Sequence, residues 1–172
     1  MNKTVAKKKL NEIITRFSKI SRNTLGKLSE QDITTKFVLP MLESFNWNIY
    51  KISREGPEIH EKAFKERLDV HKGLPDIILT SKNGAIFVEV KKPPLRESHA
   101  TELQKYRESD LIVLTSFDDL RLYTRYGKQK PKMRMSTNLA RYIDEFDKLW
   151  SILSNSQEGK ASRAAYKATA NR

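Results

Sequence analysis

Hydrophobic residues recur at helical spacing in three parts of the chain. One set lies near the N-terminus, a second follows Ser29, and a third lies toward the C-terminus. The sets are Leu10, Ile13, Ile14, Phe17 and Ile20; Ile33, Phe37, Met41, Leu42 and Phe45; and Tyr142, Ile143, Phe146, Leu149, Trp150 and Leu153. Because steps of three and four residues put side chains on one face of a helix, each set predicts an amphipathic helix.

The second of these helices carries its own boundary signals. Ser29 precedes Asp32 by three residues, an acidic variant of the capping box, which predicts that the helix begins here. Pro40 falls inside the helix and has no backbone N–H. The Lys36 carbonyl therefore loses its helical partner, and we expect a bend at this point.

Between these helices the pattern changes to short extended segments. They are residues 48–54, 63–71 and 74–93 and the runs "LIVLTSF" and "LRLYTRYG". Asn83-Gly84 is a strong hairpin-turn signal that divides residues 74–93 into two strands. Ser98 is predicted to cap a short helix after these strands, with an inner side formed by Ala100, Leu103 and Tyr106.

This order of elements predicts an α/β fold with a mixed central β-sheet flanked by helices. The expected core comprises Ile77, Ile78, Leu79, Ile86, Val88, Val90 and residues 111–114. Residues 1–153 are expected to form one domain that includes a basic N-terminal helix within residues 1–28. Residues 154–172 are small, polar and basic, which predicts a flexible tail or linker.

The net charge of the chain indicates which kind of molecule it binds. The formal net charge is +12, and residues 1–28 hold eight basic residues against a single acid, Glu12. Such a chain is expected to bind a polyanion, with a solubility surface or an RNA-associated structural role as alternatives. No window approaches the roughly 18 apolar residues of a membrane span, and the N-terminus lacks the apolar core of a signal peptide. We therefore expect a cytoplasmic protein with no membrane partner.

The residue types available also limit the chemistry of any metal site. The chain has no cysteine, and its three histidines, His60, His71 and His99, lack the close spacing of a zinc site. Disulfides and thiolate metal sites are thereby excluded. Any metal is expected to be a hard cation bound by oxygen.

Three charged residues interrupt the apolar runs of the predicted hairpin. If its strands pair antiparallel, Asp76 at the start of one strand lies beside Glu89 at the end of the other. Alternation along the second strand puts Glu89 and Lys91 on one face with Phe87. The two acids and the Val90 carbonyl then form an oxygen-rich pocket suited to Mg²⁺, with the lysine beside it.

These residues resemble a known motif. Pro75-Asp76 followed by Glu89-Val90-Lys91 resembles the PD-(D/E)xK nuclease superfamily. Five stretches add to the likeness: "EQDITTKFVLPMLESFNW", "LPDIIL", "IFVEVKKP", "LQKYRES" and "LIVLTSFDDLRLY". Over roughly residues 28–126 this layout is similar to the N-terminal endonuclease domain of type I restriction R subunits. It is also similar to fused type IIG and type I-like restriction-modification enzymes.

The resemblance implies a restriction-endonuclease-like core and an Mg²⁺-dependent DNA endonuclease, with Mn²⁺ able to substitute. Asp76 and Glu89 would be metal ligands, with Lys91 orienting or activating the attacking water. Glu30 would assist as the acid that many members carry on an earlier helix. Its alternative role is as a helix-dipole residue in the first turn. The implied partners are double-stranded DNA and the methyltransferase, specificity or motor modules of a restriction-modification enzyme.

The resemblance also points to two auxiliary residues of the site, Gln104 and Tyr106. Family members often place a glutamine and a tyrosine four positions apart on the helix after the lysine, whereas Gln104 and Tyr106 are two apart. Basic residues near the expected catalytic edge are candidates for DNA-backbone contacts or for a solvated face; they are Lys92, Arg96 and Lys105. Two alternatives to the restriction nuclease stay open. One is a non-catalytic DNA-binding module with a nuclease-like fold, and the other is a repair or junction-resolving nuclease of the same superfamily.

Overall fold

The computed structural model describes residues 1–48, 75–81, 84–106, 111–124 and 129–156, together with Gly159, Ala161 and Arg163. Most of the extended segment predicted at 48–54, all of that at 63–71, and the turn residue Asn83 lie outside these ranges. None of the described helices is both long and apolar enough to cross a membrane.

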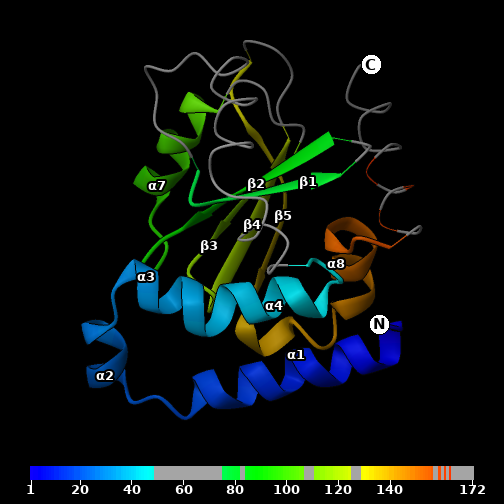
Figure 1. Ribbon diagram of the computed structural model, residues 1–172. Helices are drawn as coiled ribbons and strands as arrows, with labels where there is room; N and C mark the ends of the chain where they lie inside the picture. Colours follow the sequence, from blue (N-terminus) through cyan, green and yellow to red (C-terminus); the bar gives the residue numbers. More distant parts are fainter. Residues whose placement is uncertain are drawn as a thin grey trace.

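Among the described residues, five strands form one sheet at the centre of the molecule (Figure 1). They are β1 (Ile77–Ser81), β2 (Gly84–Val90), β3 (Leu111–Thr115), β4 (Asp119–Thr124) and β5 (Lys132–Asn138). Their order in the sheet is their order in the sequence. β2 and β3 are parallel and the other neighbours are antiparallel, which confirms the predicted mixed sheet.

Helices flank this sheet (Figure 1), as predicted. The α-helices are α1 (Lys3–Ser18), α2 (Arg22–Lys27), α3 (Glu30–Ile33), α4 (Leu39–Ser44), α7 (Glu97–Glu102) and α8 (Phe146–Leu153). A π-helical turn, η1 (Thr34–Val38), joins α3 to α4, and 3₁₀ turns occur at η2 (Leu103–Lys105) and η3 (Leu139–Arg141). α1 and α4 lie side by side along one face of the sheet (Figure 1).

The helix that begins after Ser29 follows the prediction at its start and departs from it in the middle. Ser29 and Asp32 form the expected capping box. Within η1 the Leu39 N–H bonds to the Thr34 carbonyl, five residues back instead of four. This widened turn lies immediately before Pro40, where a regular helix would press the proline ring against the Lys36 carbonyl.

Two other helix boundaries differ from the sequence-based expectation. The helix after β2 begins at Glu97 rather than after Ser98, because the Arg96 N–H is accepted by His99 Nδ1 at 3.2 Å. The C-terminal helix α8 begins only at Phe146, after Tyr142, whose hydroxyl donates to the Phe117 carbonyl at 2.6 Å. Hydrophobic spacing thus located both helices but not their first residues.

The two faces of the sheet belong to two hydrophobic clusters. Ile86, Val88 and Val90 pack on one side with residues of α1, α3, α4 and α8. Phe87 packs on the other side with residues from α7 and η2. The predicted alternation along β2 is therefore confirmed, and so is the predicted core, with Ile78 half-buried against the second cluster.

The chain after Ser154 contacts the domain through Arg163. Its guanidinium Nη1 donates to the carbonyls of Ile152 and Ser154, each at 2.8 Å. The same guanidinium lies 5.8 Å from the ring centroid of Trp47, whose indole N–H donates to the Leu153 carbonyl at 2.7 Å. Arg163 is buried, so this part of the predicted tail is tied to α8.

Candidate functional site

The register of the hairpin brings Asp76 to the end of β2. Ile77 pairs with Val88, and one further step in this register places Asp76 opposite Glu89. The Val90 N–H donates to Asp76 Oδ2 at 2.7 Å, which fixes the aspartate against the strand end. The strand ends that carry the two acids therefore meet, as the antiparallel pairing predicted.

Glu89 is a buried carboxylate surrounded by donors. Its exposed fraction is 3%. Lys91 Nζ lies 2.9 Å and Lys105 Nζ 3.3 Å from Glu89 Oε1, and the Tyr106 hydroxyl donates to Oε2. A buried charge is costly unless paired and hydrogen-bonded, and these contacts meet both conditions.

Lys91 is held between two acids. Its Nζ lies 2.9 Å from Glu89 and 3.0 Å from Glu102 Oε2, while its backbone N–H donates to the Thr115 carbonyl at 2.9 Å. Burial alone would lower the pKa of this ammonium, but the hydrogen bonds to Glu89 and Glu102 outweigh burial and raise the pKa above its ordinary value. Lys91 therefore stays positively charged across the physiological range.

Tyr106 is a buried residue that donates a hydrogen bond to Glu89. Its ring is buried and meets Phe87 edge-to-face with 5.6 Å between centroids, while Lys105 Nζ lies 4.8 Å from the ring centroid. Burial and the hydrogen bond donated to Glu89 raise the pKa of the phenol well above its usual range. The hydroxyl consequently remains a donor at any pH where the protein would function.

Asp76 has a different environment from Glu89. The residue as a whole is exposed, although its carboxyl group turns toward the sheet end. Desolvation of that group raises its pKa, the Val90 N–H bond opposes the rise, and the charges of Glu89 and Glu30 add to it. The charge of Lys91 also opposes the rise, and the net direction is upward because desolvation is the largest of these influences.

Glu30 is exposed in the first turn of α3. Its charge is one of the influences that raise the pKa of Asp76. An acid is also favoured in the first turn of a helix, so the position is compatible with either role expected from the sequence.

The donor chemistry fits a hard divalent cation. Asp76 and Glu89 supply carboxylate oxygens, and Val90 supplies a carbonyl at the end of β2. Across the described ranges, however, no three His, Cys, Asp or Glu side chains come together as a ready-made metal site. Glu89 is instead turned toward Lys91, Lys105 and Tyr106. Metal binding at this position would have to compete with those contacts.

The remaining predicted residues lie around the cluster in different ways. Lys92 and Arg96 are exposed in the segment between β2 and α7, and Gln104 is exposed on η2. Lys105, expected at the DNA backbone, is half-buried and paired with Glu89.

Glu102 was missed by sequence reasoning. It lies four positions before Tyr106, the spacing at which the resembled family places a glutamine, and it contacts Lys91. That spacing was the available signal. The difference in residue type concealed it.

No protein-family model matches the chain, and neither a curated protein nor a solved structure is significantly similar to it. The geometry of this cluster and the motif in the sequence are therefore the features that bear on function.

Proposed function

We propose that the protein is an Mg²⁺-dependent DNA endonuclease with a restriction-endonuclease-like core and a PD-(D/E)xK-type site. The observation that carries the proposal is the meeting of Asp76 with the Glu89–Lys91 pair at one sheet end. A buried acid paired with a largely buried lysine adds little stability compared with apolar residues of the same size, so stability alone does not explain the pair. Their presence beside a second acid favours a catalytic role.

Each residue has a definite part in this proposal. Asp76, Glu89 and the Val90 carbonyl would hold Mg²⁺ or Mn²⁺. When bound, the cation supplies charge stabilisation to the scissile phosphate and a more acidic water. Lys91, kept protonated by Glu89 and Glu102, orients the water and stabilises developing negative charge. Glu30 adds a carboxylate at the same end of the sheet.

In this proposal the substrate is double-stranded DNA, and the chain acts as the nuclease module of a restriction-modification system. Sequence recognition then belongs to a methyltransferase, specificity or motor module. A repair or junction-resolving nuclease would use the same cluster. It would differ in cutting branched DNA in preference to linear duplex.

The proposal is tested by removing the cluster's charges one at a time. We expect Glu89→Gln and Lys91→Ala each to reduce Mg²⁺- or Mn²⁺-dependent nicking of plasmid DNA by about 10²-fold or more. Asp144→Asn likewise turns an exposed carboxylate into an amide, outside both the cluster and α1, and should leave nicking unchanged. Circular dichroism establishes that each variant is folded.

A second candidate function is favoured by one observation. Lys91 and Lys105 both pair with Glu89, so its charge has two cationic partners within the chain, as expected of a non-catalytic DNA-binding module. Such a module would bind DNA equally well with EDTA and after Glu89→Gln, and would not cut it. Metal-dependent cleavage that persists in both Glu89→Gln and Lys91→Ala would show that other residues carry the chemistry.

A further inference from the structure

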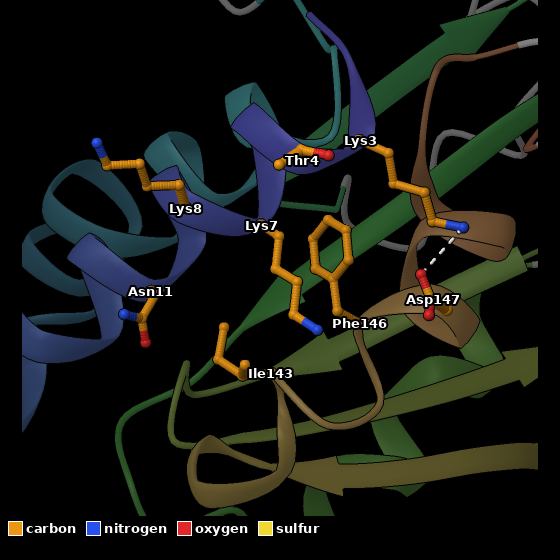
Figure 2. A pocket seen from close by; sticks show the side chains of 8 residues that line it. All are labelled: Lys3, Thr4, Lys7, Lys8, Asn11, Ile143, Phe146 and Asp147. Atoms are coloured by element: carbon orange, nitrogen blue, oxygen red, sulfur yellow. Dashed lines mark ion pairs between the residues drawn. The ribbon is translucent and has the colours of Figure 1, made fainter.

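A basic groove lies between α1 and α8, apart from the acidic cluster. It is a hollow of about 400 Å³. Figure 2 shows its lining: Lys3 and Lys7 of α1 extend toward Asp147, Phe146 and Ile143, whereas the side chain of Lys8 points away from them. Among these lining residues the lysines outnumber the one acid, so the groove carries net positive charge.

The helical repeat produces this arrangement. Lys3 and Lys7 are four residues apart, and so lie on one side of α1, while Ala6 and Leu10 on the adjoining side are buried in the core. Lys7 is half-buried, and its Nζ lies 5.9 Å from the Phe146 ring centroid, within the range of a cation–π contact. Figure 2 shows Lys7 extended beside Phe146 and Ile143.

The acid in the groove is a weak competitor for the lysines. Lys3 Nζ lies 3.0 Å from Asp147 Oδ1, with exposed side-chain fractions of 39% and 79%. An ion pair this exposed contributes little and is readily exchanged for another anion. Lys3 can therefore transfer from Asp147 to a ligand.

Further basic residues lie on the solvent side of α1, next to the groove. Lys9, Arg16 and Lys19 are exposed on this helix or at its end, and at about 100° per residue they share a sector of about 100° with Lys8. The helix has 16 residues and is therefore about 24 Å long. In Figure 1 it runs from beside α8 toward α2, which precedes α3. Glu30, in the first turn of α3, lies close enough for its charge to raise the pKa of Asp76, so these basic residues extend toward the part of the molecule that holds the acidic cluster.

We propose that this groove and the exposed basic side of α1 bind the phosphate backbone of duplex DNA. This inference rests on the proposed function, because the DNA that would be cut at the acidic cluster is the molecule that would also bind here. Duplex DNA carries a negative charge about every 1.7 Å, so the length of α1 spans about seven base pairs. Phosphates repeat regularly along DNA, so they suit basic residues spread along the whole length of α1 better than the irregular charges of an acidic protein do. Contacts of this kind hold DNA without reading its sequence.

The test is a salt titration of binding to a short fluorescent duplex in EDTA. We expect the double variant Lys7→Gln, Lys8→Gln to lower the slope of log K against log salt concentration by about 2, since each lost phosphate contact removes about 0.9. The matched control Lys130→Gln, Lys132→Gln removes the same charge from exposed positions at β5 and should leave the slope unchanged. Equal slopes for wild type and the groove variant, or equal losses in both double variants, would overturn the proposal.

A third variant tests the groove without changing any lysine. Asp147→Asn removes the acid that competes with phosphate for Lys3, so it should strengthen duplex binding at a fixed salt concentration while the slope stays near the wild-type value. Unchanged or weaker binding in this variant would count against the groove. If an unlabelled RNA or an acidic peptide displaces the duplex at a lower concentration than unlabelled duplex does, the assignment to DNA is wrong.

The result of the binding test can be distinguished from the result of the cleavage test. Glu89→Gln leaves the groove intact, so this variant should bind the duplex with the wild-type slope. Groove-dependent binding without any cleavage would reject the endonuclease and retain the groove. Cleavage with a binding slope insensitive to Lys7 and Lys8 would do the reverse.

Discussion

At the scale of single residues, Glu89 depends on donors that come from two directions. Lys91 follows it on the same strand, whereas Lys105 and Tyr106 come from η2 and the position just after it. The burial of an ionised carboxylate costs several kcal/mol unless such partners are present. The loss of η2 would therefore expose Glu89 and leave Lys91 as its partner from the strand.

We predict that Tyr106→Phe lowers the free energy of unfolding by about 1–3 kcal/mol. The change keeps the buried ring and removes the hydroxyl that donates to the Glu89 carboxylate, and bonds to charged groups are among the stronger ones. Urea denaturation measures the effect. Tyr142→Phe is the matched control, because its hydroxyl donates to the neutral Phe117 carbonyl and should contribute less. A larger loss in Tyr142→Phe would contradict the role given to Glu89.

Some residues of the cluster could be found from the sequence, and others could not. Asp76, Glu89 and Lys91 stand out because they interrupt apolar strand runs, where a charge requires an explanation. Glu102 and Lys105 lie on a short helix with other polar residues, where charges are common. Only the folding of η2 against β2 gives them partners, and spacing alone does not encode that contact.

At the scale of secondary-structure elements, the start of α3 depends on Asp32. Its carboxylate pairs with Lys36 Nζ at 2.7 Å and accepts hydrogen bonds from the hydroxyl and backbone N–H of Ser29. The bond to Lys36 contributes most, those from Ser29 add to it, and together they lower the pKa of Asp32 well below the usual range of an aspartate. A carboxylate with a depressed pKa in the folded state stabilises the fold above its unfolded pKa.

We predict that Asp32→Asn lowers the melting temperature at pH 7 and that this difference disappears in acid. The wild-type advantage should be complete above the unfolded pKa of 3.8 and be lost as pH falls through the lower, folded value. Melting temperatures of both proteins over an acidic pH series measure it. Asp144→Asn changes an exposed acid outside the cap and serves as control. A gap that stays constant down to the most acidic pH would exclude the ionised cap.

The elements also differ in how clearly the sequence encodes them. β2 and β3 are buried on both faces and read as continuous apolar runs. β5 was not predicted, because within it Met135 and Thr137 are buried and the other residues are exposed. A strand at the edge of the sheet needs few apolar residues, so hydrophobic pattern gives it little signal.

At the scale of the whole molecule, Arg163 connects the chain after Ser154 to the domain. We predict that Arg163→Met lowers the free energy of unfolding by about 1–3 kcal/mol, because the carbonyls of Ile152 and Ser154 lose their charged donor. Arg141→Met is the control, since its pairing with Glu145 is on the surface and should contribute less than about 1 kcal/mol. An unchanged urea midpoint in Arg163→Met would mean that this contact does not hold the segment.

The π-helical turn η1 limits which changes of chain length the molecule can accept. A residue added to or removed from a regular helix turns everything beyond it by about 100°, which would swing Glu30 away from Asp76 relative to α4. η1 instead holds one extra residue locally and makes room beside Pro40. A one-residue deletion there and Pro40→Ala should therefore compensate each other, although each alone is harmful. A change of chain length in this helix is therefore tolerated only together with the loss or gain of the proline, and the two changes are not independent.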